Sequence, residues 1–320
     1  MLKDLTYKVI VIDDEVDLYE DYIEFIQEQL TTEGYLLEHS RFEELSDLEE
    51  NSIKDVDLFL VDLKFGKEDK GPEFIKKIRE NYLTDILFYS SDSKAIQKNR
   101  ESGEYQGVFF AVRDENKKGI LEMVKQLIGK MIKRSNTPLS SRGIVLGCVA
   151  ELDNIIKTKI ASLLLKIEPE QRKSLMDSCI RIYYDSYKGN SKKINDFWGC
   201  DFHNGIKEWS DVKASYTDYE LSELVKNVKI TDSSKNLQVL LKTYKSLKGK
   251  DNIYTTISNF SLLLEDRNVF AHVQEELNSA GQHQFKRLNS GDYLVLSEEK
   301  CRELRTEIIN YYIHISKVDK

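Results

Sequence analysis

The chain has 320 residues, of which 40% are hydrophobic and 32% charged, so it can bury a core and is long enough for about two domains. Residues 1–129 carry 17 Lys and Arg against 30 Asp and Glu, a net charge of −13, which leaves +5 for residues 130–320. The small basic excess permits contact with phosphate backbones without indicating it. No apolar stretch reaches the roughly 20 residues of a membrane helix, so we expect no membrane contact. The four cysteines lie far apart and lack metal-ligand spacing, so we expect reduced thiols in a cytoplasmic protein.

The first 130 residues alternate short apolar runs with helical patterns. The runs are rich in β-branched and aromatic residues and predict buried parallel strands at 8–12, 57–61, 86–90 and 108–112, with a weaker strand at 35–39. Helical periodicity accompanies them at 17–30, 72–81, 93–102 and 117–134. This alternation predicts a doubly wound α/β fold with a five-stranded parallel sheet, whose ligands bind outside the carboxyl ends of the strands.

Three acidic residues directly follow two of these predicted strands. Asp13 and Asp14 come after the first strand, and Asp62 comes after the third. Parallel strands that end side by side would bring the three carboxylates to one edge of the sheet. Such an edge can bind Mg²⁺, which prefers oxygen ligands, and can place one carboxylate to attack a phosphoryl group. Solvated turn residues are the alternative interpretation of each acid taken alone.

Ser90 closes the fourth predicted strand and Arg113 follows the fifth, and with these positions residues 6–134 resemble a flavodoxin-like response-regulator receiver domain. The resemblance implies that Asp62 is the phosphoacceptor for a histidine kinase or another phosphodonor. It also implies that Ser90 and Arg113 sense the phosphoryl group. The implied Mg²⁺ ligands are Asp13, Asp14, Asp62 and the backbone carbonyl of Lys64.

Two departures from the receiver pattern leave an alternative open. The family normally has lysine where this chain has Arg113, and a guanidinium is larger, planar and differently hydrated. The loop after Asp62 is also longer than usual. A receiver-like domain that has lost phosphotransfer and serves as an interaction platform is therefore the second interpretation of residues 1–134.

The second half of the chain is predicted to be helical. A polar, proline-containing segment predicts a linker at residues 135–144, which separates domains at 1–134 and 145–320. Helical periodicity beyond it predicts an all-α bundle, with helices at 151–167, 170–187, 219–229, 236–248, 253–272 and 297–316. Residues 188–217 fit no class. No glycine turn is followed by a basic second helix, so specific DNA binding is not expected.

The most specific pattern in this half is the hexapeptide 267–272, with the form R-N-x-x-A-H. It resembles the motif of HEPN domains, all-α modules found in metal-independent RNases and associated nucleotide-binding proteins. The resemblance covers residues 145–318 and implies catalytic Arg267, Asn268 and His272, an RNA substrate and a homodimer whose two copies line one cleft. His272 can exchange protons near neutral pH, and Arg267 can bind phosphate through its fork. The alternative is structural, with Arg267 paired to neighbouring acids and His272 facing the helix dipole.

The two resemblances together predict a receiver-regulated, HEPN-type metal-independent endoribonuclease, such as a stress or phage-defence effector. Its input would be phosphorylation, or another interaction, at the acidic pocket, where Mg²⁺ is the implied cofactor. The alternative is a non-enzymatic signalling adaptor, whose helical domain binds a protein or nucleotide partner under control of the receiver-like domain.

Overall fold

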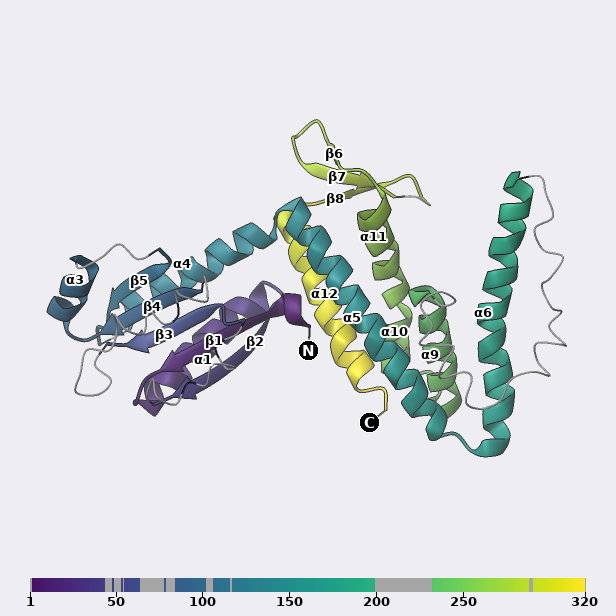
Figure 1. Ribbon diagram of the computed structural model, residues 1–320, viewed down its shortest axis with the longest axis horizontal. Coiled ribbons are helices and arrows are strands. Elements are labelled where there is room, and N and C mark those ends of the chain that lie inside the picture. Colours follow the sequence, from purple (N-terminus) through teal and green to yellow (C-terminus); the bar gives the residue numbers. More distant parts are fainter. Residues whose placement is uncertain are drawn as a thin grey trace. The chain divides into compact units, whose positions relative to one another are not determined.

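The computed structural model describes residues 2–43, 48, 53, 55–63, 78, 84–101, 106–115, 117–198, 232–287 and 290–319, with the backbone alone for 193–198. The chain divides into two compact units, residues 1–141 with 297–306 and residues 142–296 with 307–320. Within the described ranges, no helix combines the length and apolar character that spanning a bilayer requires. Figure 1 shows the elements of both units.

The first unit contains a five-stranded, all-parallel sheet with helices flanking it, which confirms that part of the prediction. The strand order is β2-β1-β3-β4-β5. The strands are β1 (Thr6–Ile12), β2 (Leu36–Phe42), β3 (Leu58–Asp62), β4 (Asp85–Ser90) and β5 (Val108–Val112). The helices are α1 (Val16–Thr32), α3 (Ser93–Glu101) and α4 (Lys118–Ser135), preceded by the short η1 (Lys3–Leu5). Of the predicted helix at 72–81, only Ile78 is described, and it is helical and buried.

The central strands carry continuous apolar runs, such as residues 9–12 of β1 and 58–61 of β3, because both faces of the sheet are covered. Every residue of β3 is buried, whereas the edge strands β2 and β5 are partly exposed. Alternate side chains build one core cluster on one face, which includes Ile10, Phe59, Val61, Ile86 and Phe88. The sheet is therefore a rigid platform for the residues that follow its carboxyl ends.

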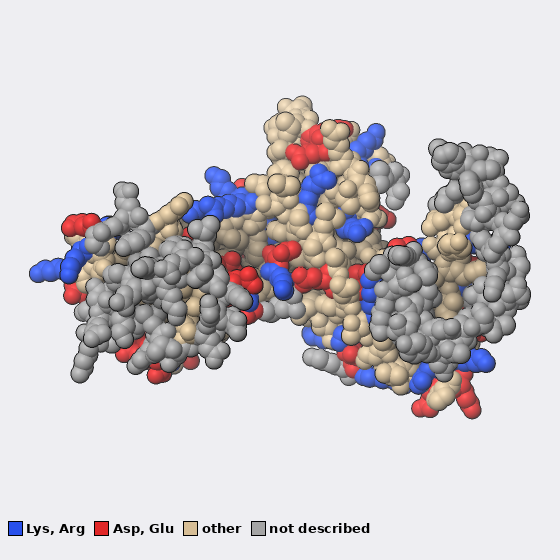
Figure 2. Space-filling view, in the orientation of Figure 1, with Lys and Arg blue, Asp and Glu red and all other residues tan. Residues whose placement is uncertain are grey.

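The second unit is mainly helical, as predicted, but it also holds a small sheet that was not predicted. Its helices are α5 (Pro138–Leu165), α6 (Pro169–Trp198), α9 (Ser233–Lys248), α10 (Asn252–Ser258), α11 (Phe260–His272) and α12 (Glu298–Ser316). The first turn of α5 and the first half of α12 belong to the first unit. The three-stranded antiparallel sheet has the order β6-β7-β8, with β6 (Glu276–Leu277), β7 (His283–Lys286) and β8 (Tyr293–Val295). On the face seen in Figure 2, basic and acidic side chains are interspersed.

Two predicted boundaries in the second half differ from the structure. The linker expected at 135–144 is reduced to Asn136 and Thr137, and Pro138 begins α5. Proline is tolerated in a first helical turn, where its missing N–H would have no partner, and the Thr137 hydroxyl accepts from the Ser140 N–H at 3.3 Å. The helix expected at 253–272 is interrupted at Asn259. The helix expected at 219–229 and most of segment 188–217 lie outside the described residues.

The start of α12 belongs to the first unit and not to the helical domain predicted at 145–320. Arg305, only 2% exposed, donates from Nε to the Glu33 carbonyl and from Nη1 to Asn136 Oδ1, both at 2.8 Å. Its guanidinium lies 4.9 Å from the ring centroid of Tyr35. Gly34, with φ +74°, makes the close approach possible, because a Cβ there would lie 2.9 Å from the Arg305 Cβ.

We expect Gly34→Ala to destabilise the first unit by more than the cost of placing an alanine in the left-handed conformation, because the added Cβ would also meet Arg305. Gly281→Ala is the matched control, because Gly281 has φ +73° but a Cβ added there would meet nothing within 4 Å. The control should lower the free energy of unfolding by about 1 kcal/mol, whereas Gly34→Ala should lower it by about 3 kcal/mol through added overpacking. Urea titration with hydrogen exchange in each unit measures both, and equal losses would contradict the packing described for Arg305.

Candidate functional site

Strands β1, β3 and β4 end level with one another at the carboxyl edge of the sheet. Ile12 pairs with Val61, and Asp62 pairs with Tyr89, in the parallel registers. Asp13 after β1, Asp62 at the end of β3 and Ser90 at the end of β4 therefore come to one edge, where each is buried. This is the edge at which parallel α/β sheets bind ligands.

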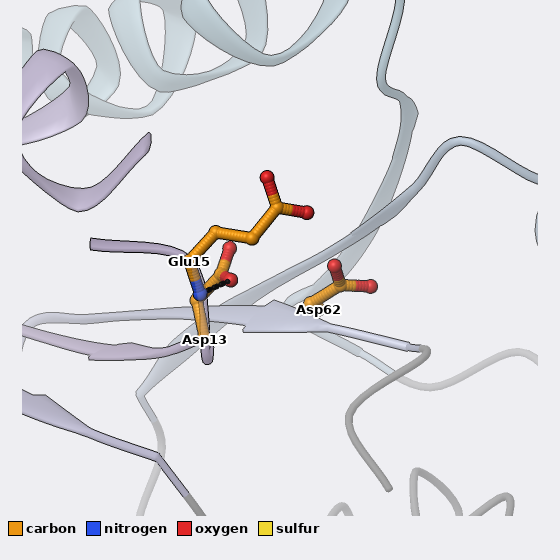
Figure 3. A group of neighbouring side chains, drawn as sticks. All are labelled: Asp13, Glu15 and Asp62. Carbon is orange, nitrogen blue, oxygen red and sulfur yellow. Dashed lines mark hydrogen bonds between the residues drawn. The ribbon is translucent and has the colours of Figure 1, made fainter. Parts of the chain in front are cut away.

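Three carboxylates converge at this edge, from Asp13, Glu15 and Asp62 (Figure 3). Each offers one oxygen, and these oxygens lie within 4.8 Å of one another. The Glu15 N–H donates to Asp13 Oδ1 at 2.8 Å, which fixes the turn after β1. Several carboxylate oxygens at such spacing are a suitable donor set for a hard divalent cation such as Mg²⁺.

Arg113 neutralises part of this negative charge. Its Nη2 lies 2.9 Å from Glu15 Oε1, and its Nη1 lies 3.5 Å from Asp62 Oδ2. The backbone N–H of Arg113 donates to the Ser90 carbonyl at 2.8 Å, so the position after β5 is tied to the end of β4. Burial disfavours the charged guanidinium, but the charges of Asp62 and Glu15 outweigh it and raise the pKa of Arg113. A cation entering this site must therefore compete with Arg113.

Two tyrosines line the buried side of the site. Tyr89 donates from its hydroxyl to Asp13 Oδ2 at 2.5 Å, and the Tyr22 ring packs edge-on against it with centroids 5.5 Å apart. Among the described residues, the buried Tyr22 hydroxyl has no hydrogen-bond partner. Burial raises the pKa of the Asp13 carboxyl, and the hydrogen bonds from Tyr89 and Glu15 only partly offset this.

The group of carboxylates differs from the predicted set. Asp14 is exposed and is not in the group; its backbone carbonyl accepts from Arg41 Nη2 at 2.8 Å. Glu15, Tyr89 and Tyr22 were not singled out from the sequence. Lys64 lies outside the described residues. Ser90 is at the edge as expected, and its hydroxyl accepts from the Asp92 N–H at 3.2 Å.

The hexapeptide of the second unit forms the end of α11. Arg267 is half-buried and donates from Nη1 to Asn268 Oδ1 at 3.0 Å, while its buried Nε has no hydrogen-bond partner within the described part of the chain. His272 is exposed in the last turn. The two residues are five apart, which separates them by about 140° around a helix. One chain therefore does not place both side chains on one face of α11.

The two candidate sites differ in whether a single chain brings their functional side chains together. The acidic site gathers residues from the ends of β1, β3, β4 and β5, whereas Arg267 and His272 of the hexapeptide point in different directions. No protein-family model and no curated protein matches this chain.

We expect Asp13→Asn to stabilise the first unit at neutral pH. A raised pKa means that the folded state binds the proton more tightly, so stability is full below the unfolded pKa of about 3.9 and falls as the pH rises through the folded pKa. The amide can still accept from the Glu15 N–H and donate to the Tyr89 hydroxyl. The free energy of unfolding at pH 7 should rise by about 1 kcal/mol.

Denaturant unfolding between pH 4 and pH 8 measures this change, and Asp14→Asn is the matched control. Since Asp14 is exposed, its substitution should change stability by less than about 0.5 kcal/mol. A lower stability of Asp13→Asn at pH 7, in protein that remains folded, would contradict the assigned burial of a charged carboxylate.

We also expect cation binding to depend on Glu15 more than on Asp14. Glu15→Gln should weaken Mn²⁺ binding, measured by calorimetry, by about tenfold, because one of three converging carboxylates loses its charge. Asp14→Asn removes the same charge from the neighbouring exposed position and should have a small effect. The reverse order of the two variants would show that the ligand set is the one implied by the receiver resemblance.

Proposed function

We propose that this protein is a receiver-regulated ribonuclease of the HEPN type, with its input at the carboxylate site of the first unit and RNA cleavage at Arg267 and His272 of the second. The observation that carries the proposal is the edge of a parallel sheet with strand order β2-β1-β3-β4-β5, where Asp13, Asp62 and Ser90 meet and Arg113 follows β5. This order is that of flavodoxin-like folds.

The chemistry proposed for the input is phosphoryl transfer to Asp62. A carboxylate oxygen of Asp62 forms a bond to phosphorus while the bond between phosphorus and the donor's leaving atom, such as a histidine nitrogen of a kinase, breaks. Mg²⁺ bound by Asp13, Glu15 and Asp62 would supply charge neutralisation for the phosphoryl oxygens. The Ser90 hydroxyl and the Arg113 guanidinium can then bind those oxygens, which draws Arg113 away from Glu15.

The chemistry proposed for the output is metal-independent RNA cleavage. The ribose 2′-oxygen attacks the adjacent phosphorus, the bond to the 5′-oxygen breaks, and a cyclic phosphate and a 5′-hydroxyl form. His272 would accept or donate one of the two protons, and Arg267 would stabilise the charge of the pentacoordinate phosphorus. Because the two residues are about 140° apart on α11, we propose that a homodimer supplies His272 and Arg267 from both copies.

The second candidate is a signalling adaptor without catalysis. The observation that favours it is the state of Arg267, which is half-buried and already donates to Asn268. In this case the helical unit binds a protein or nucleotide partner, and the carboxylate site controls that binding. The protein would fold and dimerise normally but would not cleave RNA in any phosphorylation state.

We expect the purified 320-residue chain to cleave RNA, and His272→Ala or Arg267→Ala to reduce the rate by about 10²-fold to 10⁴-fold, because acid–base catalysis contributes that much. Cleavage should persist in a chelator. The rate should also change when a small phosphodonor and Mg²⁺ are added, and Asp62→Asn should abolish that change.

His314→Ala is the matched control, because His314 lies outside the hexapeptide. Its Nδ1 is hydrogen-bonded to the Asn310 carbonyl. It should cleave RNA as the parent does. Equal cleavage by the parent and by His272→Ala would rule out the ribonuclease, and dimeric protein with no cleavage in any state would favour the adaptor.

A further inference from the structure

The small sheet β6-β7-β8 packs along α11, the helix that carries the hexapeptide. Phe285 of β7 is fully buried, and its ring meets that of Phe270 edge-on with centroids 5.2 Å apart. The His283 ring is hydrogen-bonded through Nδ1 to the Glu275 carboxylate, just beyond the end of α11. Figure 1 shows the sheet at this end of α11.

A third contact places a cation directly beside the hexapeptide. Arg287, which follows β7, has its Nη1 2.5 Å from Oδ1 of Asp266. Along β7, successive contacts from His283 to Arg287 thus meet positions of decreasing number from Glu275 to Asp266, so the strand and the helix run in opposite directions. This alignment brings Arg287 to the residue that immediately precedes Arg267.

The Asp266–Arg287 pair is built more firmly than an ordinary surface ion pair. Asp266 is buried, and leaving its carboxylate without a counter-charge would be unfavourable. The backbone N–H of Arg287 also donates to the Asp292 carbonyl at 2.7 Å, which fixes the chain after β7. The Arg287 side chain nevertheless remains 30% exposed. A guanidinium carries five N–H donors, so this contact leaves donors for a second anion.

We propose that Arg287 binds a backbone phosphate of single-stranded RNA and that Asp266 positions it for this task beside Arg267. The inference rests on the proposed ribonuclease function and names a further binding residue for it. Asp266 holds Nη1 of Arg287 and so fixes the direction of the other N–H donors of that guanidinium. The buried Nε of Arg267 has no hydrogen-bond partner among the described residues. Arg287 thus adds a second guanidinium at the residue that precedes Arg267. Guanidinium groups suit a chain of phosphates, which carries one charge per nucleotide.

The sequence could not supply this residue. Arg287 is 20 positions after Arg267 and lies in a segment where no strand is predicted. Only the packing of β7 on α11, with the strand and the helix running in opposite directions, brings Arg287 to Asp266, the residue before Arg267.

The test measures, at several salt concentrations, how the 320-residue chain binds a fluorescent single-stranded oligoribonucleotide whose 2′-O-methyl groups prevent cleavage. Arg287→Ala should weaken binding by about fivefold and reduce the slope of log affinity against log salt by about 0.7, the value for one phosphate contact on a single strand. Arg287→Lys keeps the charge and the ion pair, so the slope should stay while the affinity falls by about twofold through loss of the fork.

Lys286→Ala is the matched control, because Lys286 is the exposed neighbour of Arg287 and its loss removes the same charge. An unchanged slope for folded Arg287→Ala, or an equal reduction for Lys286→Ala, would overturn the assignment of Arg287. If Arg287→Ala does not fold, Arg287→Lys decides, and an affinity equal to the parent's would overturn it.

Failure of this inference and failure of the proposed function give different results. His272-dependent cleavage together with normal binding by Arg287→Ala would reject Arg287 as a phosphate ligand and leave the ribonuclease in place. Absence of any binding to the oligoribonucleotide by the parent, together with absence of cleavage, would reject both.

Discussion

Asp13 and Asp62 are buried side by side at the edge of a parallel sheet, with the exposed Glu15 beside them, and the candidate site depends on how the repulsion among these carboxylates is offset. The carboxylate oxygens of this group lie within 4.8 Å of one another, and two like charges at that separation repel by roughly 3 kcal/mol at an effective dielectric constant of 20. Arg113 lies against Glu15 and Asp62, while the Tyr89 hydroxyl donates to Asp13. The positive charge that the group needs is thus partly supplied from within the protein.

This internal counter-charge distinguishes the site from an open cation site. A divalent cation gains less here than it would from three unpaired carboxylates, because it must displace or share the guanidinium. A phosphoryl group on Asp62 would have the opposite effect, since it adds negative charge next to Arg113 and strengthens the attraction. The arrangement therefore favours a site whose occupancy changes the partner of Arg113, which is the local charge event that a switch requires.

The first unit also contains a contiguous route away from this site. Arg113 follows β5 and leads into α4, which ends just before Asn136. Asn136 Oδ1 accepts from Arg305 in the first half of α12, and Arg305 also holds the Glu33 carbonyl after α1. The second half of α12 counts with the other unit. For this route to carry a signal, α4 or α12 must have two positions that the carboxylate site stabilises differently.

The sequence predicted the parts of the fold that depend on local pattern. Strands such as β3 were found because a strand buried on both faces reads as an apolar run, and Asp13, Asp14 and Asp62 were expected at one edge because parallel strands share direction. Asp14 is exposed and outside the carboxylate group, and Ser90 was expected at the edge from the receiver resemblance. The packing of Arg305 against Gly34 was not predictable, because the two lie 271 positions apart and no periodicity connects them. Strands β6 to β8 were missed because they have two to four residues each, too few for alternation to be recognised.

The same reasoning explains why Glu15 was overlooked and Asp14 was not. The sequence shows three consecutive acids after β1 and cannot state which side chains turn toward the sheet edge. In the structure both Asp14 and Glu15 are exposed, but the Glu15 N–H donates to Asp13 Oδ1 and the Glu15 carboxylate lies against Arg113. The choice between the two acids thus depends on Arg113, because a guanidinium reaching across from β5 draws the carboxylate that the turn presents to it. Arg113, which departs from the receiver pattern, and Glu15, the acid that joins the carboxylate group, are thus the two partners of one ion pair.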